Sequence, residues 1–196
     1  MVVKGAIGDV RESEQILDEL LVLRCRRGDS AAWRQLIGRW DRRLLYYIRR
    51  IVSGERDAWD VLQQTWLAAF QALPSLKEPR ALRAWLYRIA HRRAISHLRH
   101  AGSAPDADAG ALDDVGDVPA EDDDGGAFPA EAAERVHACL ARLSLAHREV
   151  LTLHFLEDVS IEEIASILGV PPGTVKSRLF HAKRALRAAI ERGGAS

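Results

Sequence analysis

A segment of 31 residues without a single basic side chain divides this chain of 196 residues. Residues 101–131 contain ten Asp and Glu side chains and no Lys or Arg, and most of the rest is Ala, Gly and Pro. So few large apolar side chains cannot bury enough surface to offset the conformational entropy that is lost on ordering. We therefore expect a flexible acidic linker over residues 101–131, with folded domains on either side at residues 1–100 and 132–196.

These three segments differ in charge. Residues 1–100 carry a net charge of +8, residues 101–131 one of −10 and residues 132–196 one of +2, so the formal net charge of zero is a cancellation. Binding to nucleic-acid phosphates usually leaves a basic surface, and an evenly neutral chain would argue against such a partner. The uneven distribution of charge removes that objection, and both basic domains are candidates for binding nucleic acid.

Helical periodicity fills the first domain, whereas strand signals are nearly absent from the whole chain. Apolar residues at intervals of three and four predict four helices, at residues 16–23, 30–51, 57–73 and 80–100. Asp29 or Ser30 can cap the second helix, and Pro74 ends the third. The predicted core positions are Trp33, Leu36, Ile37, Trp40, Leu44, Tyr47, Ile48, Ile51, Leu62, Thr65, Trp66, Ala69, Phe70, Leu73, Leu82, Trp85, Leu86 and Ile89.

The second domain contains a pattern typical of a helix-turn-helix. Helices through Val136 to Leu143 and through Val150 to Phe155 are expected to precede it. Ser160 and Glu163 form a capping box, and Gly169 can adopt the left-handed conformation that ends a helix. The turn Pro171-Pro172-Gly173 then leads to a second helix, which we expect to begin at Thr174. The chain is thus predicted to be all-α, with a four-helix domain and a helix-turn-helix domain.

The second helix of this motif divides into two faces. Val175, Leu179, Ala182 and Leu186 recur at three and four and are expected to pack inward. The opposite side is basic and polar, and in a helix-turn-helix that side enters the DNA major groove. Its candidate DNA contacts are Thr174, Lys176, Ser177, Arg178, Phe180, His181 and Arg184. The alternatives are a plain structural corner for the motif and a solubilising role for its cations.

Two helices of the first domain also carry surfaces that are candidates for binding a partner or nucleic acid. The third helix carries Asp60, Gln63, Gln64 and Leu67 opposite its apolar stripe, and solvated surface is the simpler interpretation. The fourth helix interleaves aromatic rings with cations, a combination that suits unstacked bases and their phosphates. A solvated charged helix with one buried Trp explains that pattern equally well. These residues are Trp85, Tyr87, Arg88, His91, Arg92, Arg93, His97 and Arg99.

Other function classes lack their signatures. Cys25 and Cys139 make no disulfide framework and fit a reducing compartment, and their spacing from His residues matches no zinc pattern. No apolar run is long enough to cross a bilayer, and no signal peptide is visible, so we expect a cytoplasmic protein without membrane insertion. Without a Gly-rich phosphate loop or a nucleophile motif, an enzyme is not expected, nor is a metal or a cofactor.

Two motif sets resemble region 2 and region 4 of the extracytoplasmic-function (ECF) sigma factors. Residues 57–66, DAWDVLQQTW, and residues 83–90, RAWLYRIA, resemble region 2. Arg148-Glu149-Val150 and the motif at residues 160–179 resemble region 4. The resemblance covers roughly residues 15–100 and 132–190, in the order that the family has them.

The resemblance implies an initiation subunit that binds core RNA polymerase and directs it to promoters, with region 2 melting the −10 element and region 4 reading the −35 element. It implies that core polymerase binds the third helix at Asp57, Asp60, Gln63, Gln64 and Leu67. Contacts to −10 DNA are expected from Lys77, Arg80, Arg83, Trp85, Tyr87, Arg88, Arg92 and Arg93. Contacts to −35 DNA are expected from Thr174, Lys176, Ser177, Arg178, Phe180, His181 and Arg184. The acidic linker would enter polymerase channels that later hold RNA.

The sequence departs from the family pattern at four positions. Trp59 and Gln64 stand where acidic residues are usual, and Arg92 and Ser96 replace the usual Asn and Asp. Phosphorylation of Thr65, or of nearby Ser53, by a Ser/Thr kinase would add a charge of about −1.5 to −2 and restore an acidic docking surface, although Thr65 also fits the core stripe. Control by an anti-sigma factor is the more ordinary expectation.

One alternative function shares the helix-turn-helix. A two-domain transcriptional regulator would bind DNA through the second domain without docking on polymerase, but it would leave the region 2 pattern unexplained.

Overall fold

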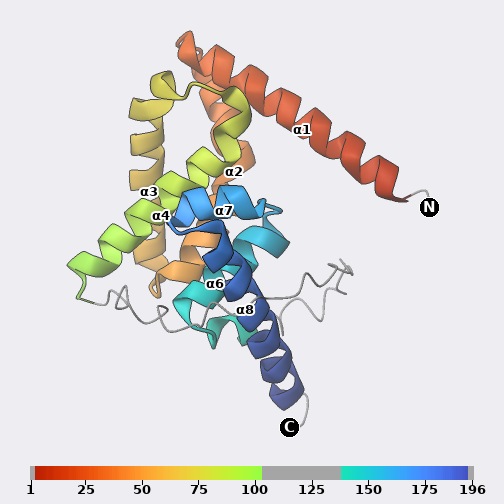
Figure 1. Cartoon of the computed structure of the whole chain (residues 1–196). Coiled ribbons are helices and arrows are strands. Elements are labelled where there is room, and N and C mark those ends of the chain that lie inside the picture. Colours follow the sequence, from red (N-terminus) through yellow and green to blue (C-terminus); the bar gives the residue numbers. More distant parts are fainter. Residues whose placement is uncertain (1–2, 103–137, 194–196) are drawn as a thin grey trace. The chain divides into compact units, whose positions relative to one another are not determined.

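The computed structural model describes residues 3–102 and 138–193, with side chains from residue 12 onward. Every regular element in these ranges is helical, which confirms the all-α prediction (Figure 1). The chain divides into two compact units, residues 1–97 and 98–196, and each is described by itself. Nearly all of the predicted linker, residues 103–131, lies outside the described residues, so its boundaries stay a prediction.

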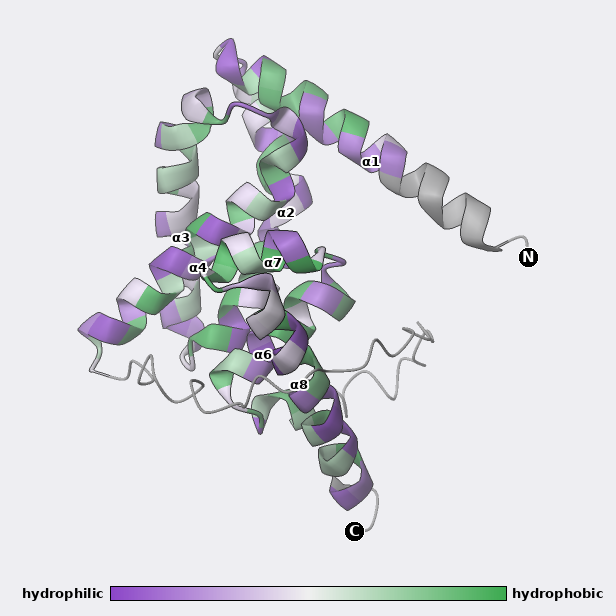
Figure 2. Ribbon diagram, viewed as in Figure 1, coloured by the Kyte–Doolittle hydropathy of each residue, from purple (hydrophilic) through white to green (hydrophobic). Residues whose placement is uncertain are grey.

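The first unit contains four helices in the predicted order. They are α1 (Val3–Arg26), α2 (Ser30–Ile51), α3 (Glu55–Ala72) and α4 (Leu82–His100). Two short 3₁₀ turns, η1 (Leu73–Ser75) and η2 (Pro79–Ala81), join α3 to α4 where the sequence predicted an irregular loop. Hydrophilic and hydrophobic residues alternate along helices such as α1 (Figure 2), and Leu36, Leu44 and Ile48 of α2 are fully buried.

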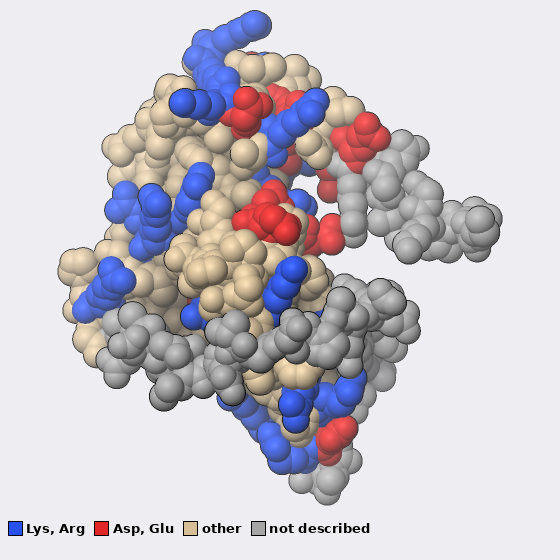
Figure 3. Space-filling view, in the orientation of Figure 1, with Lys and Arg blue, Asp and Glu red and all other residues tan. Residues whose placement is uncertain are grey.

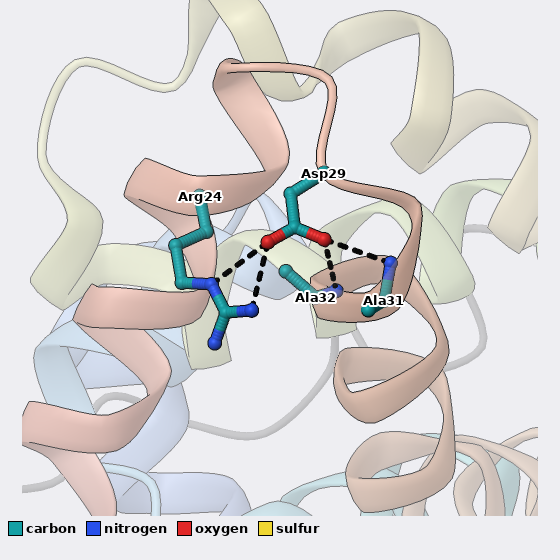
Figure 4. Close-up of polar contacts among 4 residues, drawn as sticks. All are labelled: Arg24, Asp29, Ala31 and Ala32. Atoms are coloured by element: carbon teal, nitrogen blue, oxygen red, sulfur yellow. Dashed lines mark hydrogen bonds and ion pairs between the residues drawn. The ribbon is translucent and has the colours of Figure 1, made fainter.

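Asp29 fixes the corner between α1 and α2. Its Oδ1 accepts hydrogen bonds from the backbone N–H groups of Ala31 (2.8 Å) and Ala32 (3.1 Å), which caps α2 (Figure 4). Its Oδ2 accepts from Arg24 Nε at 2.9 Å and pairs with Arg24 Nη2 at 2.7 Å. These backbone and guanidinium donors hold the pKa of Asp29 below its ordinary value. Gly28, with φ of 81°, makes the turn that brings the carboxylate here.

The buried face of α3 is rotated from the predicted one. Ala58, Val61, Leu62, Thr65 and Ala69 are the buried residues, whereas the predicted core residue Phe70 is 60% exposed. Phe70 lies against Trp33 of α2, with ring centroids 5.1 Å apart. The apolar stripe of α3 is wider than the face that α2 can cover, and its aromatic edge is left at the surface.

The second unit begins, within the described residues, with a helical segment at residues 138–141. It continues through α6 (Leu145–Leu151), the π-helical turn η3 (Thr152–Leu156), α7 (Ile161–Leu168) and α8 (Pro172–Gly193). Val136, from the first helix expected in this unit, lies outside the described residues, while Leu140 and Leu143 are buried.

Two expectations for this unit are wrong in detail. The helix expected through Val150 to Phe155 is α-helical only as far as Leu151 and continues as a π turn, in which Phe155 is 41% exposed. The last helix starts at Pro172 and not at Thr174. Pro suits the first turn of a helix, since its φ is already helical and the missing N–H needs no partner there.

Candidate nucleic-acid and partner interfaces

The helix-turn-helix is held by the capping box that the sequence predicted. Ser160 Oγ accepts from the backbone N–H of Glu163 at 3.3 Å, and Glu163 Oε2 accepts from the backbone N–H of Ser160 at 3.0 Å. Gly169 ends α7 in the left-handed region, with φ of 70° and ψ of 34°. The backbone N–H groups of Gly169 and Val170 both reach the carbonyl oxygen of Ala165. The turn that sets α8 against α7 is therefore fixed by local bonds.

The inner face of α8 is as predicted, apart from its last position. Val175, Leu179 and Ala182 are buried, and Leu186 is half-buried. This packing turns Lys176 and Arg184 outward, where both are exposed. The other five candidates for −35 DNA are half-buried: Thr174, Ser177, Arg178, Phe180 and His181.

Three of these candidates form a cluster that sequence reasoning treated as separate residues. The rings of Phe180 and His181 meet edge to face at 5.3 Å, and the Arg184 guanidinium lies over the Phe180 ring at 5.6 Å. An aromatic residue followed by a cation four positions later was the signal that could have found it. Lys183 turns elsewhere, to the ring of Phe155 at 5.0 Å.

The polar face of α3 brings together the five residues implied as polymerase contacts. Asp60, Gln63 and Gln64 are exposed, and Leu67 is 60% exposed. Asp57 is half-buried, with Oδ2 at 3.8 Å from His97 Nε2 of α4. The exposed Trp59 and Phe70 adjoin this face, so its edge is more apolar than the mixed polar face that the sequence indicated.

Thr65 is not a phosphorylation site in the folded protein, which corrects the sequence hypothesis. Its side chain is fully buried, and Oγ1 donates to the carbonyl oxygen of Val61 at 2.8 Å. A kinase cannot reach this hydroxyl, and a phosphate there would be a buried dianion. The alternative residue, Ser53, is exposed in the turn before α3.

Cations line the loop after η1 and the segment from η2 through α4, and Lys and Arg side chains recur on the surface over α4 (Figure 3). Lys77, Arg92 and Arg93 are exposed, and so is Arg80, which forms an ion pair with Glu19 of α1 at 3.3 Å. The remaining two candidate cations, Arg83 and Arg88, are half-buried.

Two candidate aromatic contacts to −10 DNA are corrected by the fold. Trp85 is only 8% exposed and Tyr87 is fully buried, so neither presents its ring to a base. The Tyr87 ring packs edge-on against Tyr47 at 5.3 Å and against Trp40 at 6.1 Å. These rings form the core between α2 and α4 because Tyr87 adjoins the stripe of Leu82, Leu86 and Ala90.

Metal binding has no assembled site in the part of the chain that the structure describes. No group of three or more His, Cys, Asp and Glu side chains there could hold a metal ion. Burial raises the pKa of the Cys25 thiol to about 11, which keeps it protonated and inert. Within the same residues, none of the helices has the length and apolar character that crossing a membrane requires.

Both units of the chain match known protein families. The family described as Sigma-70 region 2 matches residues 36–104, and that described as Sigma-70, region 4 matches residues 133–186. The RNA polymerase sigma-H factor of Pseudomonas aeruginosa is 34% identical, and the alignment covers 89% of this chain and 94% of that protein. The ECF RNA polymerase sigma-E factor of Escherichia coli (strain K12) is 33% identical, and the alignment likewise covers 89% of this chain and 94% of that protein.

A solved structure agrees with these matches. The structure of CnrH in complex with the cytosolic domain of CnrY has a TM-score of 0.64 and 27% identity, covering 90% of this chain and 98% of that one. Both motif sets, the helical fold and the relatives lead to one assignment. This chain belongs to the ECF group of the sigma-70 family and is an RNA polymerase sigma factor.

Proposed function

We propose that this sigma factor binds core RNA polymerase through α3, opens promoter DNA at α4 and reads the −35 element with α8. The helix-turn-helix of α7 and α8 carries the proposal, because its capping box and left-handed Gly169 hold a helix whose outer face is basic. As a transcription initiation subunit, it acts in the cytoplasm and catalyses no reaction of its own.

The docking surface on α3 consists of Asp57, Asp60, Gln63, Gln64 and Leu67. Its carboxylates suit a basic partner helix, its amides supply hydrogen bonds, and Leu67 offers an exposed apolar anchor. Trp59 and Phe70 extend the apolar part of the surface. Docking on polymerase therefore depends more on apolar contact, and less on charge, than in a relative with two further carboxylates.

The −10 surface consists of the cations of α4 and its preceding loop. Lys77, Arg80, Arg92 and Arg93 are exposed and suit the phosphates of a separated strand. Arg80 exchanges its ion pair with Glu19 for a phosphate on binding, and exposed pairs of this kind are weak enough to exchange. Arg83 and Arg88 support this surface from half-buried positions.

The −35 surface lies on the first turns of α8. Lys176 and Arg184 are its exposed cations, Phe180 and His181 reach base edges, and Thr174 and the free N–H groups of the first turn suit a phosphate. Ser177 and Arg178 lie deeper: Ser177 Oγ and Arg178 Nε are buried without a hydrogen-bond partner among the described residues. Because both atoms are shielded from solvent, these two residues support the surface and do not reach DNA through those atoms.

Regulation by a partner protein fits this assignment. A sigma factor from Bartonella quintana with the same fold, RpoE, was solved in complex with the anti-sigma factor NepR. We propose an anti-sigma factor for this chain too. The acidic segment at residues 101–131 would mimic nucleic acid in the polymerase channels.

Copurification with core polymerase, followed by run-off transcription from a cognate promoter, tests the function. The expected result is a stable complex that starts transcription at one position. A protein that binds the promoter but neither associates with polymerase nor starts a transcript would instead be a regulator acting through DNA alone.

A further inference from the structure

Helix α1 is apolar on two opposite faces. One face packs into the first unit, where Leu21, Val22 and Cys25 are buried. The other carries Ile16, Leu20 and Leu23, which are 60%, 49% and 45% exposed. Their spacing of four and three places them one above the other, directly opposite the buried face. A helix on a solvated surface needs only one apolar face, so the outer stripe calls for a partner.

The outer stripe changes charge from one end to the other. Glu12 lies one turn before Ile16, and Arg27 stands just after the end of α1, four residues beyond Leu23; both are exposed. The acidic side chains level with the middle of the stripe turn away from it. Asp18 Oδ1 accepts from Arg39 at 2.9 Å, and Glu19 pairs with Arg80 at 3.3 Å. From Glu12 to Arg27 the outer face is therefore acidic, then apolar, then basic, with the basic residue in the turn that follows α1.

This order is complementary to itself in the antiparallel direction. If two copies of α1 lie side by side in opposite directions, Ile16 of one faces Leu23 of the other and the two Leu20 side chains meet at the centre. Glu12 then lies opposite Arg27 at each end. We propose that the outer face of α1 pairs with the same face of a second copy of this chain, as an isologous two-fold dimer.

Other occupants fit the stripe less well. A parallel pair would bring Glu12 against Glu12 and Arg27 against Arg27, which repel. A partner helix of one charge sign would match one end of the stripe and oppose the other. The antiparallel copy matches all three parts, and the spacing of three and four is that of a coiled-coil seam.

The pairing is weak. Three large side chains per protomer bury much less than the total of about 1,200 Å² at which stable interfaces begin. The dimer is therefore a concentration-dependent association. It goes beyond the proposed function and is independent of it, because no residue of the stripe belongs to the surfaces of α3, α4 or α8.

Sedimentation velocity of the full chain, from low micromolar to submillimolar concentration, tests the pairing. The sedimentation coefficient of the wild type is expected to rise with concentration, and that of Leu20→Glu to stay at the monomer value throughout. Ile190→Glu, at another exposed apolar residue, is the matched control and should associate as the wild type does. Circular dichroism of each variant verifies that the helices are intact.

A charge exchange tests the direction of the pair. Glu12→Arg and Arg27→Glu are each expected to weaken association, and the double variant to restore it, because only the antiparallel pair brings these two positions together. A monomer at every concentration overturns the proposal. So does a Leu20→Glu protein that associates as the wild type does, or a double variant no better than the single ones.

Discussion

Arg24 and Asp29 tie the end of α1 to the start of α2, with Arg24 Nε donating to Asp29 Oδ2 at 2.9 Å while Asp29 Oδ1 caps α2. One carboxylate thus holds a helix terminus and an ion pair at the corner from which α2 enters the core. Since α2 packs on α3, this corner helps to position the surface that we propose docks on polymerase.

Replacing Asp29 tests this corner through its pH dependence. The pKa of Asp29 is lowered in the folded state, so its contribution to stability is complete above the unfolded pKa and is lost as the pH falls through the folded pKa. We expect Asp29→Asn to be less stable than the wild type near neutral pH, and the difference to shrink in acid. Urea unfolding at a series of pH values measures it. A constant difference would show that the carboxylate charge contributes nothing.

Thr65 separates a packing role from a regulatory one. Because its hydroxyl is buried and bonded to Val61, Thr65→Val should change the free energy of unfolding by only about 1 kcal/mol. Thr65→Glu places a charge in the core and should destabilise by about 3 kcal/mol or more. Denaturant unfolding of both variants measures these two changes in the free energy of unfolding. A Thr65→Glu protein as stable as the wild type, with tighter polymerase binding, would restore the phosphorylation hypothesis.

Asp158 adopts a left-handed conformation, with φ of 53°, in the turn between η3 and α7. Asp tolerates this region, whereas a β-branched residue does not. We expect Asp158→Val to destabilise the second unit by about 1–2 kcal/mol, and Asp158→Gly to leave it close to the wild type. Thermal unfolding compares the two. Equal losses in both variants would mean that the side chain of Asp158, and not its backbone conformation, is what matters.

The −35 surface can be probed by its salt dependence. Lys176→Ala should weaken binding to a duplex that carries the −35 element and reduce the slope of log affinity against log salt by about 1. Arg192→Ala removes a cation from the far end of α8 and serves as the control. Fluorescence anisotropy across salt concentrations gives both slopes. The same slope in Lys176→Ala and the wild type would remove Lys176 from the phosphate contacts.

The fold was predictable where local signals agree. Ser160, Glu163 and Gly169 each specify their own backbone conformation, so the helix-turn-helix could be read from the sequence. The rotation of a helix about its axis is set by neighbours distant in sequence, which is why Phe70 was assigned to the core and Tyr87 to the surface. The π turn at Thr152–Leu156 has no such sequence signal.

The candidate sites also divide into residues that the sequence could place and residues that only the packing of the helices decides. Polar residues on an amphipathic helix must lie outside, so the α3 face and the cations of α4 were predictable. Interleaved rings and cations do not reveal which of the rings fill the core. Tyr87 was therefore assigned to DNA, and Trp85 was assigned both to DNA and to the core, although both rings pack inside.

Reconstituted transcription tests the central claim that both units act together on polymerase and promoter. Leu67→Glu should lose binding to core polymerase and the transcript, yet keep the affinity of the chain for −35 DNA. The double variant Lys176→Ala and Arg184→Ala should keep polymerase binding and lose the promoter-specific transcript. A full yield of the correctly started transcript from either variant would contradict the account.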